Sequence, residues 1–116
     1  MTQDEMDAIV MAFPMAEKGI SYGRPSYKVN GKFFTRLRRE DGSVVLMDVS
    51  FDEREMLMEA EPRTFHFTAH YKDYPCVLAR IDNLHPGSFK NFLERRWRKI
   101  APKKLVKEYE AANAAP

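Results

Sequence analysis

The chain of 116 residues has the usual size of one domain, long enough to bury roughly two-thirds of its unfolded surface in a single core. Apolar residues make up 44% and charged residues 31%, which is too apolar a composition for a disordered chain. The net charge of +2 is too small to indicate a nucleic-acid partner by itself. We expect one domain over residues 1–116, with a core from about 4 to 110 and a frayed tail over 111–116.

Cysteine usage and the N-terminal segment predict the compartment. Cys76 is the one cysteine, so neither an intrachain disulfide nor a cysteine-based zinc cage can form within one chain. The N-terminus is acidic, and the apolar run from Ala8 to Phe13 stops at Pro14, far short of a secretory or membrane-spanning segment. We expect a cytoplasmic protein without membrane contact.

The first expected element is a helix over residues 4–13, where apolar residues recur at spacings of three and four and Pro14 follows. The segment 19–25 contains two glycines and a proline, which indicates a loop leading to the first strand. The helical face consists of Met6, Ile9, Val10 and Phe13.

Two turn signals then predict a three-stranded antiparallel meander. Asn30-Gly31 and Asp41-Gly42 separate the apolar runs. A two-residue turn at Asn30-Gly31 would mix apolar and basic side chains on each face, whereas a loop one residue longer separates them. The longer loop predicts a core face of Tyr27, Val29, Phe33, Thr35 and Leu37 and an outer face of Lys28, Phe34, Arg36 and Arg38.

The second half of the chain predicts a helix, two strands and two further helices. Ser50 and Glu53 form a capping-box pattern that opens the helix, with Met56, Leu57 and Ala60 as its buried stripe. Strands are expected near 65–67 and 76–81, and helices over 86–100 and around 105–109. The order α-βββ-α-ββ-αα predicts a two-layer α+β fold, an antiparallel sheet of about five strands with helices largely on one face.

Catalytic patterns are weak. His66 and His70 are four residues apart on a segment that is not expected to be helical, so a metal site is disfavoured. Cys76 could act as a nucleophile beside His70, but a lone cysteine at the start of an apolar strand is more typical of a core residue. The five glycines are scattered and fit turns rather than a phosphate loop. We therefore expect no enzyme, no metal site and no cofactor.

The basic residues are concentrated near the C-terminus, where residues 86–116 hold eight Lys/Arg against three Glu. Such a stripe gains free energy on phosphates by releasing counterions, while the alternative is a solvated helix face paired with Glu94 and Glu108. A second basic strip with Phe34 among it lies on the expected outer face of the meander, a pattern that suits nucleic acid. The candidate nucleic-acid-binding residues are Lys28, Arg36, Arg38, Arg39, Arg95, Arg98, Lys99, Lys103 and Lys104.

Four segments, in this order and spacing, carry a family pattern between about Ala8 and Leu105. They are Ser21-Tyr22-Gly23-Arg24-Pro25-Ser26-Tyr27-Lys28-Val29, Gly31-Lys32-Phe33-Phe34, His70-Tyr71-Lys72-Asp73-Tyr74-Pro75 and Trp97-Arg98-Lys99-Ile100-Ala101-Pro102-Lys103-Lys104-Leu105. The pattern resembles the MmcQ/YjbR family of small bacterial proteins, although Cys76 stands where a tryptophan is expected. The resemblance implies an α+β fold similar to that of type III secretion chaperones and a DNA-binding role, with no catalytic residues to carry over.

Aromatic residues of these segments form a second candidate site. Polar-tipped aromatic side chains in loops often line a pocket or an interface, although they also serve to pack long loops onto a core. The sequence thus favours a non-enzymatic binding module for DNA, with a protein-interaction or chaperone-like module as the alternative. A third class, a small-molecule binder or enzyme with a pocket of Tyr71, Tyr74 and Trp97, lacks an acid, base or cofactor motif. The candidate pocket residues are Tyr22, Arg24, His70, Tyr71, Tyr74 and Trp97.

Overall fold

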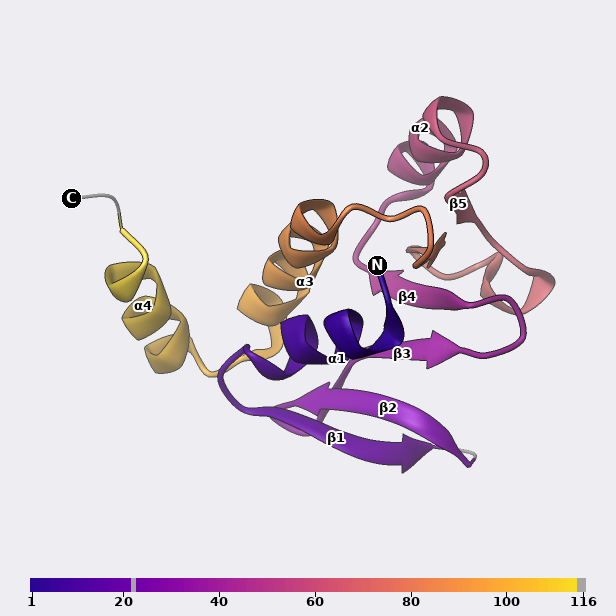
Figure 1. The fold of residues 1–116 in the computed structure, drawn as a ribbon. Helices are drawn as coiled ribbons and strands as arrows, with labels where there is room; N and C mark the ends of the chain where they lie inside the picture. The colour runs from indigo at the N-terminus through magenta and orange to yellow at the C-terminus, as the bar shows by residue number, and fades with distance from the viewer. Residues whose placement is uncertain (22, 115–116) are drawn as a thin grey trace.

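The computed structural model describes residues 1–21 and 23–114, which form an open antiparallel sheet of six strands and four α-helices (Figure 1). The strand order is β1-β2-β3-β4-β6-β5, and the predicted α+β class is confirmed. The strands are β1 (Ala16–Ser21), β2 (Arg24–Val29), β3 (Lys32–Arg38), β4 (Ser43–Met47), β5 (Phe65–His66) and β6 (Cys76–Arg80). The helices are α1 (Gln3–Met11), α2 (Phe51–Ala60), α3 (Pro86–Ile100), α4 (Lys103–Ala112) and the short 3-10 helix η1 (Ala69–Tyr71).

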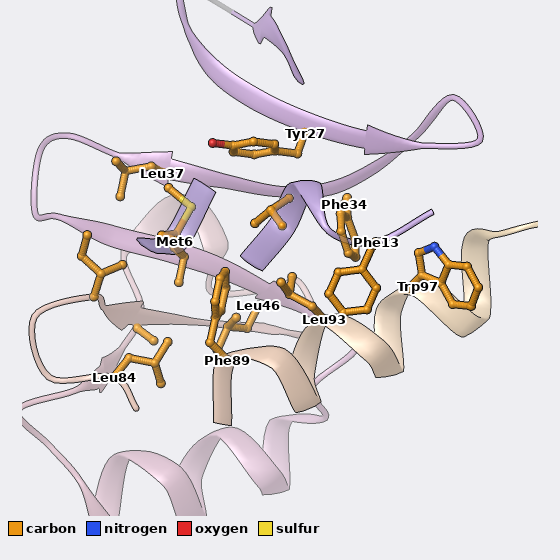
Figure 2. Packing of buried hydrophobic residues seen from close by; sticks show 14 of the residues in the cluster. Met6, Phe13, Tyr27, Phe34, Leu37, Leu46, Leu84, Phe89, Leu93 and Trp97 are labelled. Carbon is orange, nitrogen blue, oxygen red and sulfur yellow. The ribbon is translucent and has the colours of Figure 1, made fainter. Parts of the chain in front are cut away.

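Helices α1 and α3 cover one face of the sheet and enclose the main core. Phe89, Leu93 and Trp97 recur along α3 at spacings of four and are fully or almost fully buried, as their periodicity predicts. Figure 2 shows Tyr27, Phe34 and Leu37 on the strand side of this core, opposite the side chains of the two helices. The larger part of the buried apolar surface therefore lies on a single face of the sheet.

Strand β1 forms where the sequence predicts a loop. It pairs with β2 from Ala16 opposite Val29 to Ile20 opposite Pro25, and it is the edge of the sheet. The β2–β3 ladder begins only at Ser26, so at Pro25 strand β2 has β1 as its one neighbour. A proline is tolerated at such an edge-like position because no ladder partner needs its missing N–H. Gly19 in β1 and Pro25 in β2, which suggested a loop, are thus compatible with this strand pair.

The turn between β2 and β3 has two residues, so the longer loop expected from the sequence is wrong. Val29 pairs directly with Lys32, and Asn30 and Gly31 have φ values of 54° and 73°. Positive φ at both central positions gives a turn whose twist matches that of the flanking strands. The additional residue needed to separate apolar from basic side chains lies elsewhere in the hairpin.

A β-bulge in β3 supplies that residue. Lys28 pairs with Phe33, but Tyr27 pairs with Thr35, so Phe34 has no opposite residue. The bulge turns Phe34 into the main core, where it is 0% exposed, and leaves Phe33 half-buried on the opposite face. The two phenylalanines therefore exchange the faces that the sequence assigns to them, while Tyr27 lies in the core as expected.

Helix α2 buries only part of the expected stripe: Leu57 packs against the main core, but Met56 and Ala60 do not. Ser50 caps it by accepting a hydrogen bond from the Glu53 N–H, but Met56 is 64% exposed. Ala60 is likewise exposed, and the buried residue of the helix is Arg54. Helix α2 packs beside β5 and β6 at the end of the sheet, and its packed side combines Arg54 with the partly buried Leu57 and Met58.

The bulge predicts unequal costs for truncating the two phenylalanines. Phe34→Ala should lower the free energy of unfolding by about 3–5 kcal/mol, because it leaves a cavity in the main core. Phe33→Ala should cost only about 1–2 kcal/mol, because Phe33 is already partly exposed. Urea denaturation of both variants measures the difference, and a reversed order would support the longer turn instead.

Candidate functional site

A groove of about 730 Å³ lies on the face of the sheet opposite α1 and α3. Its floor comes from β3, β4 and β6, where Val45, Leu78 and Cys76 form a second, smaller buried cluster. The segment 69–76 forms a wall of the groove. The described residues that line it are Ser26, Phe33, Arg36, Arg38, Val45, Met47, His70, Tyr71, Tyr74 and Cys76.

Arg54 holds this wall in place from behind. Its Nη1 donates to the carbonyl oxygens of Tyr71, Tyr74 and Cys76, each at 3.3 Å, and its Nη2 donates to that of Lys72 at 2.9 Å. No carboxylate pairs with this guanidinium among the residues that the structure describes, and the arginine is 7% exposed. One side chain thus fixes the path of the whole segment.

Aromatic rings extend the support of Arg54 on both sides of the guanidinium. The Arg54 Cζ lies 4.2 Å from the ring centroid of Phe67 and 4.9 Å from that of Phe51. In the wall itself, the rings of His70 and Tyr71 meet edge to face with centroids 4.7 Å apart. These contacts order the aromatic side chains that face the groove.

Two arginines of β3 line the groove, and their environments differ. Arg38 lies 3.3 Å from a carboxylate oxygen of Glu40 and 3.7 Å from one of Asp41, and its guanidinium lies over the Tyr71 ring at 5.6 Å. The Nε of Arg36 is buried and has no hydrogen-bond acceptor, and no ion pair joins Arg36 to a described residue. The groove therefore carries one cation whose charge is balanced and one whose charge is not.

The structure unites three of the predicted pocket residues and separates a fourth from them. His70, Tyr71 and Tyr74 line the groove together. Trp97 lies on the other face of the sheet, fully buried, where its Nε1 donates to the Pro14 carbonyl at 2.9 Å. Tyr22 and the side chain of Arg24 lie outside the described part of the structure.

Carboxylates balance much of the predicted basic cluster of α3. Arg95 pairs with Glu53 at 2.7 Å, and this contact raises the pKa of the guanidinium. The Lys99 Nζ lies 3.2 Å from the carboxylate of Asp48. Arg98 lies 3.5 Å from Glu110, so the three cations expected to share a phosphate-binding face each have a carboxylate neighbour.

The two predicted basic strips lie on opposite faces of the sheet and approach each other at one end. Asn30 in the β2–β3 turn donates from its Nδ2 to the carbonyl of Ile100, the last residue of α3, at 3.1 Å. Figure 1 shows the link between α3 and α4 beside this turn. The lysines that flank this contact are exposed, and none has an ion pair with a described residue. We call Lys28, Lys32, Lys103 and Lys104 the basic end.

Lys32 and Arg39 show how the hairpin distributes charge. Lys32 belongs to the basic end although the sequence did not single it out, since its place near the end of α3 depends on the contact between the turn and α3. Arg39 is exposed in the β3–β4 turn, at the other end of β3. No hydrogen bond or ion pair among the described residues joins Arg39 to the basic end.

A serine, a histidine and an aspartate meet between β4 and β5, but they do not form a catalytic triad. The His66 Nε2 lies 2.8 Å from the Ser43 Oγ and 3.7 Å from the nearer Asp41 carboxylate oxygen. In a triad the hydroxyl and the carboxylate occupy different ring nitrogens, whereas here both approach Nε2. Ser43 is also 0% exposed, so this cluster joins strands and cannot attack a substrate.

The remaining groups offer little chemistry for metal binding or nucleophilic attack. Burial raises the pKa of the Cys76 thiol, which opposes formation of the reactive thiolate. The residues described by the structure contain no group of three or more histidine, cysteine or acidic side chains that could hold a metal ion. Within the same residues, no helix has the length and apolar character needed to cross a membrane.

Comparison with known proteins identifies relatives of the chain. The model of the YjbR family matches residues 11–99. Uncharacterized proteins of Mycobacterium bovis and of two strains of Mycobacterium tuberculosis are each 28% identical to the chain over 125 aligned residues. Each alignment covers 95% of this chain and 96% of the relative. No solved structure matches the chain significantly.

The support that Arg54 gives to the groove wall can be tested through Cys76. Arg54→Ala should lower the free energy of unfolding by about 2–4 kcal/mol, because four carbonyl groups lose a charged donor. It should also accelerate labelling of Cys76 by an aromatic disulfide reagent under native conditions. Glu55→Ala, on the exposed side of the same helix, is the matched control, and equal labelling rates in both variants would contradict this role.

His66 predicts a loss of stability below neutral pH. Burial, and secondarily the nearby Arg80, lowers the pKa of His66 in the folded chain below its ordinary value of 6.5. The unfolded chain therefore takes up the proton more readily, and the free energy of unfolding falls as the pH drops through and below 6.5. Denaturation at about pH 7.5 and about pH 5.5 should show a smaller change for His66→Gln than for His70→Gln or the unmodified protein.

Proposed function

The chain belongs to the YjbR family, and we propose that this member is a non-enzymatic module that binds the phosphate backbone of nucleic acid at its basic end. The hydrogen bond from Asn30 to the Ile100 carbonyl carries the proposal, because it brings lysines of the β2–β3 hairpin and of α4 to one end of the molecule. Neither element alone has enough cations to hold a polyanion.

The charges of the basic end support contact with the phosphate backbone of nucleic acid rather than recognition of a base sequence. Lysine ammonium groups act as point charges that neutralise phosphates and release counterions. Lys32, Lys103 and Lys104 are exposed and free of ion pairs with described residues, so binding need not break internal contacts. Four phosphate contacts would give a slope of roughly −3 to −4 for the logarithm of affinity against the logarithm of salt concentration.

The solvent-facing side of α3 is a weaker candidate for the same role. To bind phosphates, Arg95 and Lys99 would have to break their ion pairs with Glu53 and Asp48. The loss of these pairs would offset part of the binding free energy gained from the phosphates. Arg36 lies in the groove on the opposite face and cannot join α3 in one continuous stripe. The proposal therefore retains Lys28, Lys103 and Lys104 of the predicted set and adds Lys32.

A protein-interaction role remains the second candidate because β1 is an open edge. Ile20 on this strand is 80% exposed, and an edge strand with an exposed apolar side chain can pair with a strand of another chain. Size-exclusion chromatography with light scattering, before and after Ile20→Lys, tests self-association through this edge. A monomer at all concentrations would exclude it.

The nucleic-acid proposal predicts a charge effect that depends on position. In fluorescence anisotropy with a labelled duplex and a labelled single strand, the triple variant Lys32→Gln, Lys103→Gln and Lys104→Gln should bind at least about tenfold more weakly at low salt. Its salt slope should also become shallower by roughly 3, because three phosphate contacts are lost.

A matched control removes three positive charges from the other end of the sheet. Arg39→Gln, Arg63→Gln and Lys72→Gln change the net charge equally, at exposed residues distant from the β2–β3 turn. This variant should keep most of the affinity. Equal losses in both variants would show that only net charge matters, and absence of binding at low salt would overturn the proposal.

A further inference from the structure

The groove on the open sheet face has the dimensions and lining of a small-molecule site. Its volume of about 730 Å³ lies within the range of roughly 300–1,000 Å³ that is typical of such cavities. Phe33, Val45 and Met47 provide an apolar floor, and the rings of Tyr71 and Tyr74 stand in its wall. Flat apolar ligands bind well on surfaces of this kind, where aromatic rings can stack on them.

Arg36 supplies a polar anchor in this apolar setting. Its Nε is buried without a hydrogen-bond acceptor, although buried donors are nearly always paired. The guanidinium presents donors in a planar fork that matches the oxygen atoms of carboxylates and phosphates. The Nε itself is buried, so an oxyanion in the groove would accept instead from the terminal Nη1 and Nη2 atoms of Arg36, which make no hydrogen bond to a described residue.

The balance of charge in the groove selects an anion. Among the described residues that line the groove, none is an aspartate or a glutamate. Glu40 and Asp41 both lie within 4 Å of Arg38, so Arg36 is the guanidinium of the described lining that lacks a carboxylate within that distance. One unbalanced cation in an apolar groove fits a ligand with one anionic group.

We infer that the groove binds a small organic anion, a flat apolar molecule whose carboxylate or phosphate group is held by Arg36 and whose body packs against Phe33, Tyr71 and Tyr74. This site shares no residue with the basic end. A single unbalanced cation cannot track a polymer backbone, so the groove and the basic end recognise different ligands.

Isothermal titration calorimetry with three probes of one shape tests the site. The probes are 2-naphthoate, 2-naphthyl phosphate and the neutral 2-naphthalenemethanol. Both anions should bind with one-to-one stoichiometry, and at least about tenfold more tightly than the neutral probe, because only the anions form an ion pair with the guanidinium. The tighter of the two anions identifies the natural headgroup as a carboxylate or a phosphate.

Two groove variants and one control separate the anchor from the apolar surface. Arg36→Gln should weaken both anions at least about tenfold and leave the neutral probe unchanged. Tyr74→Ala, at an exposed position where folding is not at risk, should weaken all three probes to a similar extent. Arg98→Gln on α3 makes the same charge change outside the groove and should alter none of them.

Several results of these titrations would contradict an anion site in the groove. Absence of saturable binding by either anion, or equal affinities for the anionic and the neutral probes, would overturn it. Unchanged anion affinity in Arg36→Gln would overturn the role of Arg36, and unchanged affinity in Tyr74→Ala would place the ligand elsewhere. Circular dichroism of each variant confirms that a lost affinity does not reflect a lost fold.

Discussion

The guanidinium of Arg54 is the interaction on which the open face of the sheet depends. It reaches from the buried side of α2 to four backbone carbonyl groups of residues 71–76, a segment whose regular structure is limited to the end of η1 and the start of β6. Buried carbonyl groups need donors, and a single planar cation provides them at several points of the chain at once. Arg54 therefore fixes the position of the wall that carries Tyr71 and Tyr74, although Arg54 itself does not line the groove. Affinity in the groove and stability of α2 should accordingly be coupled.

Asp48 organises the charges on the other side of the molecule. It adopts a φ of 61°, unusual for a residue with a side chain, and its carboxylate receives both Arg96 and Lys99. Arg96 also donates to the Phe33 carbonyl, so the link runs from the loop after β4 through α3 to β3. Arg96 and Lys99 thus form contacts within the chain and stabilise the fold. A count of lysines and arginines along α3 overstates the charge available to a partner, and the lysines of the basic end, which have no ion pair with a described residue, lie near the contact between the β2–β3 turn and the end of α3.

The sequence predicted the elements whose signals are local and missed the features that arise from tertiary contacts. The spacing of Phe89, Leu93 and Trp97 is sufficient to predict α3, and Asn30-Gly31 predicts the position of the turn, although not its two-residue length. No local pattern marks a bulge at Phe34, because Phe33 and Phe34 have the same propensity and only the packing of α1 and α3 selects between them. Arg54 stands among exposed charged residues in α2 and cannot be distinguished from them by composition. His70, Tyr71 and Tyr74 were predicted together because they belong to one family segment in an expected loop, whereas Arg36 was assigned to a basic strip and its apolar surroundings were not visible.

The placement of Trp97 has a consequence for spectroscopy. It is the one tryptophan of the chain, it is 0% exposed, and it lies beneath α1 with its indole N–H bound to Pro14. The open face of the sheet instead carries tyrosine, phenylalanine and histidine rings. Intrinsic emission excited at the red edge of the absorption band therefore reports on the helical side alone. A ligand can fill the groove while this emission stays constant, and screens that follow tryptophan fluorescence would pass over it.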